Sequence, residues 1–202
     1  MRILTLDDLD TTGKTVFLRV DMNVPIHPQK LDIIEHSRIN EASITIRDLN
    51  RSKVVVGSHQ GRVGRYDYIG MDQHARVLEK ILGKKVDYVE DVMGPEARKR
   101  ISSMRDGDVL ILDNLRFCAE ENYEFDPAEA AKTVMVRRLS ELFDLCVLDC
   151  FPSAHRSHPS IVGFPHVLPA CAGRIVEREV RNLDEIMTVA KAPHVIVLGG
   201  SK

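Results

Sequence analysis

Short apolar runs of the kind that form buried strands recur along the chain, and stretches with helical periodicity lie between them. The predicted strands are rich in Val, Ile or Leu and comprise Thr15–Val20, Lys53–Gly57, Lys85–Val89, Asp108–Leu112, Asp144–Leu148 and His194–Leu198. Strands that are apolar along their whole length are typical of a parallel sheet with both faces covered. The sequence therefore predicts an α/β fold, a doubly wound and Rossmann-like domain of three layers around a parallel, six-stranded sheet.

The predicted helices are Ser37–Asn50, Asp72–Leu82, Pro95–Met104, Pro127–Leu142 and Ala172–Ala190. Gly83 suits a left-handed end for the second helix, and Pro95 suits the first turn of the third. The last helix combines an apolar stripe with a charged face, so it could cover the sheet or connect to a further domain. The strand predicted after it ends in a glycine turn at 199–202, and such a turn normally leads into a helix whose N-terminus binds an anion.

The composition is that of an ordinary globular protein, and it limits the kinds of function. Hydrophobic residues make up 44% of the 202 residues and charged residues 29%, so the chain can bury a full core. A net charge of -2 disfavours a general nucleic-acid binder, and 5% aromatic residues disfavour base stacking. The N-terminus has no apolar signal core, and no stretch approaches a membrane span. We therefore expect a cytoplasmic protein with neither nucleic acid nor membrane as a partner.

The cysteines indicate a reducing compartment. Cys118, Cys146, Cys150 and Cys171 form no C-x-x-C pair, which predicts four reduced thiols. Zinc is an alternative, since Cys150, His155 and His158 could form a partial ligand set. Their spacing matches no standard zinc finger, so we expect no metal ion to be held by this chain.

Basic side chains gather where the predicted strands end. Asp21 and Asn23 follow the first predicted strand, and Arg38 opens the first helix. The second strand is followed by His59, Gln60, Gly61 and Arg62, the fourth by Arg116, and the fifth by His155 and Arg156. The carboxyl ends of parallel strands meet at one edge of a sheet, where open α/β sheets bind their ligands. Several cations in one cleft repel each other unless an anion is present, and arginine pairs bidentately with phosphate or carboxylate. The pattern predicts a site for a small polyanion.

Several of these side chains also have a purely structural interpretation. Arg38 could be a solvated side chain, although a cation in the first turn of a helix opposes the helix dipole. His59 could simply cap a turn, and Arg116 could form a local ion pair with Asp113 or Glu120.

Three of these strand-end residues are not basic, yet they also suit the anion site. Asp21 and Asn23 alternate with Arg19 on one side of the chain and could orient an arginine or bind a hydroxyl group. Gly61 would let a backbone N–H approach a ligand closely. His158, which precedes a proline, is expected to support its loop rather than to touch a ligand.

Six motifs together resemble the phosphoglycerate kinase family. In chain order they are Arg-Val-Asp-Met-Asn-Val-Pro at 19–25, Arg38-Ile39, Ser-His-Gln-Gly-Arg at 58–62, Asp-Asn-Leu-Arg-Phe at 113–117, Ala-His-Arg-Ser-His at 154–158 and Leu-Gly-Gly-Ser-Lys at 198–202. Their order and spacing fit the family over essentially the whole chain, and the glutamine at position 60 is similar to archaeal members.

The resemblance implies half of a two-domain, hinge-bending enzyme of glycolysis and gluconeogenesis. That enzyme transfers a phosphoryl group reversibly between 1,3-bisphosphoglycerate and ADP, giving 3-phosphoglycerate and ATP. Residues 1–170 would be the N-terminal domain that binds 3-phosphoglycerate, 171–191 the connector helix, and 192–202 the beginning of a truncated nucleotide-binding domain. The implied substrate contacts are Asp21, Asn23, Arg38, His59, Gln60, Gly61, Arg62, Arg116, His155 and Arg156. Arg38 and Lys202 would be catalytic, and Gly199, Gly200 and Lys202 would contact the nucleotide.

The same resemblance places the magnesium nucleotide, ADP or ATP, largely on the missing second domain. This chain alone is therefore expected to bind phosphoglycerate without turnover. Departures from the family pattern concern loop shape: Pro152 and Ser153 replace Gly-Thr, Val63 stands where proline is usual, and Asp113 replaces a glutamate. Two other classes remain open, a non-catalytic anion-binding or regulatory module and an RNA-binding α/β domain, of which the composition disfavours the second.

Overall fold

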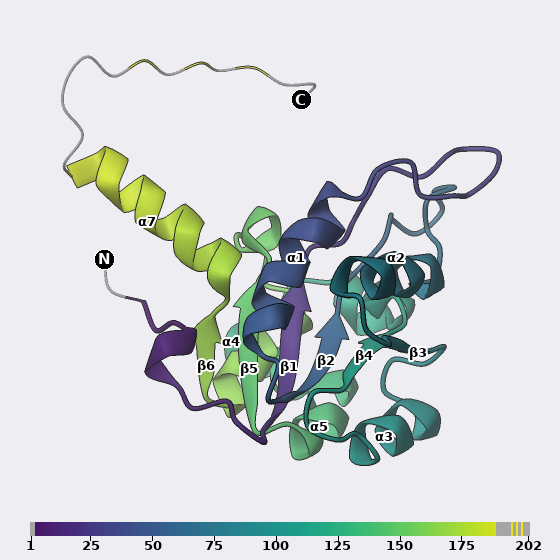
Figure 1. The fold of residues 1–202 in the computed structure, drawn as a ribbon, viewed down its shortest axis with the longest axis horizontal. Helices are drawn as coiled ribbons and strands as arrows, with labels where there is room; N and C mark the ends of the chain where they lie inside the picture. The colour runs from purple at the N-terminus through teal and green to yellow at the C-terminus, as the bar shows by residue number, and fades with distance from the viewer. Residues whose placement is uncertain (1–2, 189–194, 196, 198, 200–202) are drawn as a thin grey trace.

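The centre of the molecule is a parallel sheet (Figure 1) in the computed structural model, which describes residues 3–188, 195, 197 and 199. Its strands are β1 (Thr15–Val20), β2 (Lys53–Gly57), β3 (Asp87–Val89), β4 (Val109–Leu112), β5 (Leu145–Asp149) and β6 (Ala170–Ala172). They form one six-stranded sheet in the order β3-β4-β2-β1-β5-β6, and every pairing is parallel. The predicted doubly wound α/β fold is confirmed.

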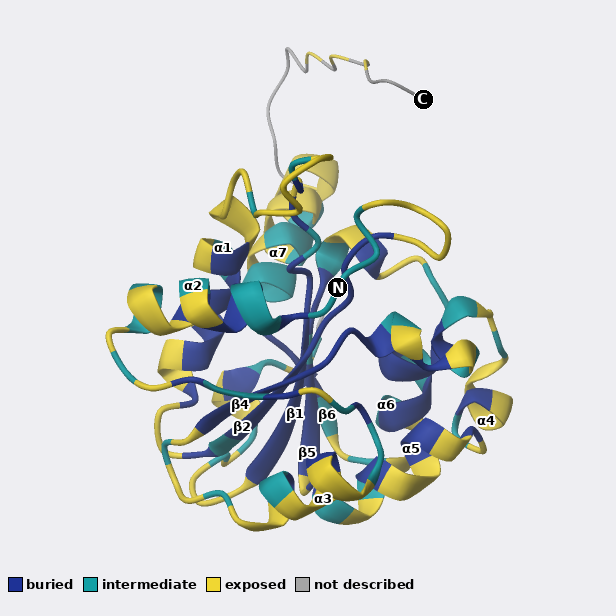
Figure 2. Ribbon diagram, turned by 90° about the vertical axis from the view of Figure 1, so that its right-hand side faces the viewer, coloured by how far each residue is buried: buried dark blue, intermediate teal, exposed yellow. Residues whose placement is uncertain are grey.

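Helices cover both faces of this sheet, as Figure 2 shows. The α-helices are α1 (Ser37–Asp48), α2 (Asp72–Leu82), α3 (Pro95–Ser102), α4 (Pro127–Ala130), α5 (Val134–Leu139), α6 (Phe164–Val167) and α7 (Arg174–Thr188). One hydrophobic core lies between the sheet and α1 and α2, and a second lies between the sheet and α3, α5 and α6. As predicted, α2 ends at Gly83 with a positive φ of 67°, and α3 begins at Pro95 after Gly94.

The alternation of side chains along β1 divides it between the two cores. Leu18 points into the first core, while Phe17 contributes to the second and packs against the rings of Phe143 and Phe164, at centroid distances of 5.2 and 4.3 Å. All six residues of β1 are buried, because the strand has neighbours on both sides and helices on both faces.

The strand order reverses between β1 and β5. After β1 the chain passes through α1 to β2 on one side, whereas after β5 it passes through α6 to β6 on the other. The two connections leave the sheet edge in opposite directions and open a crevice between them, which is where doubly wound sheets bind ligands. The fold therefore places the loops after β1 and β5 on the two sides of one crevice.

The sixth strand differs from the prediction. β6 was not expected, because a three-residue strand that follows Pro169 is too short to show an apolar run. It pairs with β5 from Ala170 to Ala172, and the backbone of Ala172 also forms a bridge with Thr5. The strand predicted at His194–Leu198 lies mostly outside the described residues.

The helix predicted at Pro127–Leu142 is broken into α4, α5 and a 3-10 turn at Ser140–Leu142. The break lies at Thr133, whose backbone is extended (ψ 153°) and whose hydroxyl donates to the Ala130 carbonyl at 2.7 Å. The Glu120 carboxylate then accepts the N–H groups of Val134 and Met135, at 2.9 and 3.1 Å. These bonds start a new helix, because they satisfy N–H groups that have no partner within α5.

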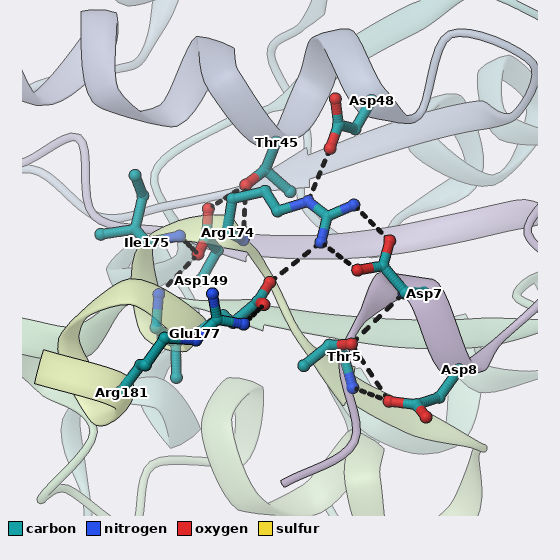
Figure 3. A network of polar contacts seen from close by, with 11 residues as sticks. Thr5, Asp7, Asp8, Thr45, Asp48, Asp149, Arg174, Ile175, Glu177 and Arg181 are labelled. Atoms are coloured by element: carbon teal, nitrogen blue, oxygen red, sulfur yellow. Dashed lines mark hydrogen bonds and ion pairs between the residues drawn. The ribbon is translucent and has the colours of Figure 1, made fainter. Parts of the chain in front are cut away.

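A polar network holds the start of α7 (Figure 3). The buried Asp149 carboxylate, at the end of β5, accepts the N–H groups of Ile175 and Val176 at 2.8 and 3.1 Å and the Thr45 hydroxyl at 2.6 Å. Gly173 is required beside it, since a Cβ there would lie 2.4 Å from the Asp149 carboxyl carbon. Burial raises the pKa of Asp149 despite these bonds. One carboxylate thus joins β5, α1 and α7.

All four cysteines are buried and free, in agreement with the prediction of reduced thiols. Burial raises the pKa of Cys150 and of Cys171 to about 11 in each case. A thiol with such a pKa is a poor nucleophile at neutral pH. None of the described helices has the length and apolar character needed to cross a membrane.

Candidate functional site

A polar cleft of about 450 Å³ opens at the carboxyl ends of the central strands. Its lining comes from loops far apart in the sequence and comprises Asp21, Asn23, Arg38, His59, Gly61, Arg62, Arg65, Asp67, Arg116, Pro152, Ser153, His155 and Arg156. Residues that follow β1, β2, β4 and β5 therefore meet at one edge of the sheet, in the crevice where the strand order reverses.

The loop after β1 and the first turn of α1 meet in an ion pair. Arg38 Nη1 lies 2.5 Å from Asp21 Oδ2, and Asp21 Oδ1 accepts the N–H of Asn23 at 3.0 Å. The carboxylate offsets the unfavourable position of a cation at a helix N-terminus. The Asp21 side chain is 7% exposed, whereas that of Arg38 is 46% exposed. Asp21 thus orients Arg38 while leaving much of its guanidinium open to the cleft.

His59 follows β2 and is almost completely buried at the cleft wall. Arg19 Nη2 lies 3.2 Å from His59 Nδ1. Because an arginine side chain can only donate, Nδ1 accepts this bond and the ring proton lies on Nε2. Burial, followed by repulsion from Arg19 and Arg116, lowers the pKa of His59 from 6.5 to about 2. The ring is therefore neutral at physiological pH and carries one donor.

Gly61 forms the sharp turn that places Arg62 at the cleft. Its φ is +66°, and a Cβ at this position would lie 2.3 Å from the Asp67 carbonyl oxygen. Its N–H was predicted to approach a ligand, but in the structure this N–H already donates to Asn23 Oδ1 at 2.9 Å. The Gly61 carbonyl accepts from Arg116 Nη1. Gly61 therefore connects the loops after β1 and β4.

Arg116 stands in a 3-10 turn after β4 and is held from both sides. Asn114 Oδ1 accepts the backbone N–H of Arg116 at 3.1 Å, and the Tyr68 hydroxyl donates to its carbonyl at 2.6 Å. The local ion pairs considered from the sequence do not form, since Asp113 and Glu120 accept backbone N–H groups instead. Burial and the neighbouring guanidinium groups of the cleft lower the pKa of Arg116.

The loop after β5 supplies the opposite wall. A 3-10 turn at Phe151–Ser153 brings Pro152, Ser153, His155 and Arg156 to the cleft. The Arg156 side chain forms no hydrogen bond or ion pair within the described part of the chain, and its backbone N–H donates to the Ser153 carbonyl at 3.0 Å. Behind this wall His158 is buried, with Nδ1 3.1 Å from the Tyr123 carbonyl. His158 supports the loop, as expected.

Gln60 is predicted at the site but lies beneath the cleft rather than in its lining. Its side-chain amide accepts the N–H of Val24 and donates to the carbonyl of Val24, both at 3.0 Å. Its Oε1 also lies 3.1 Å from His74 Nε2. The side chain of Gln60 is fully buried, so its geometry suits a support for the loop after β1 rather than a contact with substrate.

The remaining predicted residues belong to the C-terminal segment. Gly199 is exposed and is not part of the cleft lining, while Gly200 and Lys202 lie outside the described residues. Within the ranges that the structure describes, no group of three or more His, Cys, Asp or Glu side chains could hold a metal ion. We therefore assign no nucleotide or metal contact to the described residues.

Two charged residues of the lining were not identified from the sequence, Arg65 and Asp67. Both lie in the 62–70 loop, which carries no apolar pattern that would fix its direction. The one signal for Arg65 is its position three residues after Arg62 in the sequence Arg-Val-Gly-Arg. One oxygen of Asp67, Oδ1, is buried without a hydrogen-bond partner in the described structure.

The charge of the cleft is strongly unbalanced. Five arginines line it against two aspartates, which leaves an excess of three positive charges from these side chains. One of the aspartates, Asp21, is already paired with Arg38. Guanidinium groups stay charged at any accessible pH, so this excess persists and favours a ligand with several negative charges.

The arrangement can bind and orient an anion, but it carries no activated nucleophile. The described lining of the cleft contains no cysteine, and Cys118 and Cys150 are buried with raised pKa values. Its one histidine with a strongly shifted pKa, His59, is a donor rather than a base at neutral pH. The described lining can therefore act on a ligand electrostatically, by binding and orienting its negative charges.

Comparison with known proteins agrees with this geometry. A family model described as phosphoglycerate kinase matches residues 6–202. Phosphoglycerate kinase 2 of Methanosarcina acetivorans is 47% identical over 199 residues, and the phosphoglycerate kinase of Sulfurisphaera tokodaii is 42% identical over 204 residues. These alignments cover 98% and 100% of this chain.

A solved structure gives the same result. The crystal structure of phosphoglycerate kinase from Pyrococcus horikoshii superposes with a TM-score of 0.94 at 42% identity, over 99% of this chain. The chain spans about half the length of the relatives it matches, 48% and 49% of the two sequences and 49% of the crystallised chain.

Proposed function

The chain belongs to the phosphoglycerate kinase family, and we propose that it forms the phosphoglycerate-binding half of such an enzyme. The proposed reaction is reversible phosphoryl transfer between 1,3-bisphosphoglycerate and ADP, which gives 3-phosphoglycerate and ATP. The proposed ligand of the cleft is 3-phosphoglycerate, a molecule with a phosphate at one end and a carboxylate at the other.

One observation carries this proposal: the cleft combines five arginines with only two carboxylates, in the crevice where the strand order reverses. A ligand with two separate anionic groups suits guanidinium groups that approach from opposite walls, such as Arg62 and Arg116 on one side and Arg156 on the other. The family membership then selects phosphoglycerate among small polyanions.

In the proposed mechanism the side chains of this chain bind, orient and neutralise. Arg38, open to the cleft and oriented by Asp21, would stabilise the charge that spreads over the transferring phosphoryl group. His59 would donate from Nε2 to an anionic oxygen, and Asn23 would hold the turn at Gly61. No general base is required, because the attacking oxygen belongs to a phosphate or carboxylate that is already ionised.

The family also implies a magnesium complex of ADP or ATP in the whole enzyme, which supplies or accepts the phosphoryl group. Among the described residues, no group of three or more His, Cys, Asp or Glu side chains could hold a metal ion. We propose that turnover requires a nucleotide-binding domain, to which the Gly-Gly-Ser-Lys motif at 199–202, including Lys202, would belong.

A thermal-shift titration tests the proposed ligand. At a concentration about a hundred times Kd, 3-phosphoglycerate should stabilise the fold by roughly 2.7 kcal/mol. Arg38→Ala should remove most of this shift. Arg76→Ala is the matched control, since Arg76 is an exposed arginine paired with Asp72 on α2 and is not part of the cleft lining, so this variant should respond like the wild type.

Three outcomes would count against the proposal. A shift with an RNA oligonucleotide but not with 3-phosphoglycerate would indicate an RNA-binding domain. An equal shift with inorganic phosphate would indicate a general anion or regulatory site. ATP-dependent turnover by this chain alone would contradict the proposal that a second domain must be added.

A further inference from the structure

A chain of buried polar contacts runs beneath the cleft wall and ends at His59. It begins at Glu121, in the 3-10 turn at Ala119–Asn122, and passes through Ser160 and Arg19. Glu121, Arg19 and Ser160 are at most 1% exposed, so none of them can contact a ligand in the cleft directly. Of the residues that line the cleft, His59 is the one to which this chain is hydrogen-bonded, through Arg19.

The direction of each hydrogen bond in this chain is fixed by the groups that form it. Glu121 Oε2 accepts the N–H of Ser160 at 2.9 Å, and Oε1 accepts the Ser160 hydroxyl. A hydroxyl has one proton, so the Ser160 oxygen is left as an acceptor for Arg19 Nε, at 2.7 Å. Because the carboxylate takes the hydroxyl proton, it orients the lone pairs of the Ser160 oxygen toward Arg19.

Arg19 is a buried cation whose neighbours fix its orientation. Its Nη1 donates to the Val20 carbonyl at 2.5 Å, and its Nη2 donates to His59 Nδ1 at 3.2 Å. Glu121 Oε1, at 3.8 Å from Nη2, is the only carboxylate that forms an ion pair with Arg19 in the described part of the chain. Without it, a buried guanidinium would have no compensating charge, which is strongly unfavourable.

The tautomer of His59 decides whether its Nε2 attracts or repels an anion. With Nδ1 occupied by the Arg19 donor, the proton is on Nε2, and this atom donates. In the other tautomer Nε2 would present a lone pair, which repels an anionic oxygen. Arg116, Arg156 and His158 also face His59 electrostatically, and all of them disfavour a second proton on the ring.

We propose that Glu121, acting through Ser160 and Arg19, is a positioning residue that keeps His59 a neutral donor toward the anion in the cleft. The proposal rests on the proposed function of the cleft, since it concerns how the same ligand is held. It assigns the role to a carboxylate that lies away from the ligand and contributes a negative charge beneath a cleft with a positive excess.

Glu121→Gln tests the role of the charge, because the amide keeps the shape and one acceptor oxygen. Without the carboxylate, Arg19 should move away from His59 Nδ1, and that atom is then free to carry the proton. We therefore expect heteronuclear NMR of the histidine rings to show a single Nε2–H tautomer for His59 in the wild type and a mixture in the variant. The affinity for 3-phosphoglycerate, measured by calorimetry, should fall about tenfold, the loss of one charge-assisted hydrogen bond.

Glu120→Gln is the matched control, at the neighbouring position. Glu120 accepts two backbone N–H groups at the start of α5 and has no contact with Ser160. This variant should lower Tm while leaving the His59 tautomer and the affinity unchanged. Ser160→Ala provides a second route, since it keeps the charge and removes the hydroxyl, and it should produce the same tautomer mixture.

A His59 tautomer that stays single in both Glu121→Gln and Ser160→Ala would overturn the proposal, and so would an affinity that stays within twofold of the wild type. The ring signals are measured without ligand. If the wild type binds no 3-phosphoglycerate, the proposed function fails, while the NMR comparison still decides whether Glu121 positions His59. If Glu121→Gln does not fold, Ser160→Ala alone decides it.

Discussion

Arginine has opposite surroundings in the cleft and at the start of α7. In the cleft, Arg116 lies near other guanidinium groups, which together with burial lower its pKa. At the start of α7, Arg174 is bound by three carboxylates, and the hydrogen bonds to them raise its pKa (Figure 3). Arg116 therefore has other arginines as its charged neighbours in the cleft, whereas Arg174 is surrounded by carboxylates.

The distances show how completely Arg174 is satisfied. Its guanidinium donates to Asp7 Oδ1 and Oδ2 at 2.7 and 2.9 Å, to Asp48 Oδ2 at 2.6 Å and to Glu177 Oε2 at 2.9 Å. These bonds join the N-terminal segment, α1 and α7. The number of arginines alone therefore does not identify an anion site. What identifies it is how few carboxylates lie within reach of those arginines.

The largest effect is expected for Arg156→Met, which should sharpen the contrast. The Arg156 guanidinium has no intramolecular partner among the described residues, so its loss should hardly change Tm. Its removal should weaken 3-phosphoglycerate binding about a hundredfold, because a bidentate, charge-assisted contact is lost. Calorimetry and a melting curve on the same sample measure both. A large drop in Tm with unchanged affinity would mean that Arg156 serves the fold.

The next effect concerns pH and the neutral state of His59. The folded-state pKa is about 2 and the ordinary value is 6.5, so below pH 6.5 the unfolded chain binds a proton that the folded chain rejects. Stability is therefore complete above pH 6.5 and falls as pH falls toward 2. By pH 5.5 this amounts to about 1.4 kcal/mol for one histidine.

His59→Gln removes this titration, so its stability should decrease less between pH 8 and pH 5.5 than that of the wild type. Denaturant unfolding at the two pH values measures how much the free energy of unfolding decreases in each protein. His74, whose pKa burial lowers to about 4, titrates in both proteins and cancels in the comparison. An equal decrease in the free energy of unfolding for the two proteins would contradict a neutral His59.

The smallest effect is expected for Arg174→Met. Two of its three carboxylate partners are well exposed, with side-chain exposures of 71% for Asp7 and 45% for Asp48, so those two contacts stabilise weakly. We expect Tm to fall by roughly 2–4 °C and the affinity for 3-phosphoglycerate to stay unchanged. If this variant weakened binding as much as Arg156→Met, the two regions would not be functionally distinct.

The sequence predicted the strands that bear the site because their apolar runs are long. The bounds of β1 and β2 agree residue by residue, and the loops that follow them carry Asp21, Asn23, His59 and Arg62 to the cleft. Parallel pairing alone then brings the strand ends together. The convergence of the cationic residues was therefore predictable without any knowledge of side-chain contacts.

Other features depend on contacts that no local pattern reveals. β6 is too short to show periodicity, and the break before α5 depends on Glu120, which is distant in sequence from the N–H groups that it accepts. Gln60 stands in a motif beside His59, and only the fold shows that its amide turns inward to Val24. Sequence motifs locate a site, but they do not separate its lining from its supports.

Asp149 attaches one end of a long helix to the sheet. Its carboxylate fixes the base of α7, a helix of 15 residues and therefore about 22 Å long, to the strand that leads into the loop of Arg156. A rotation of about 5° at this base would displace the far end of the helix by roughly 2 Å. The same carboxylate stands only a few residues before Pro152 of the cleft lining, so the base of α7 and the cleft wall share one attachment to β5.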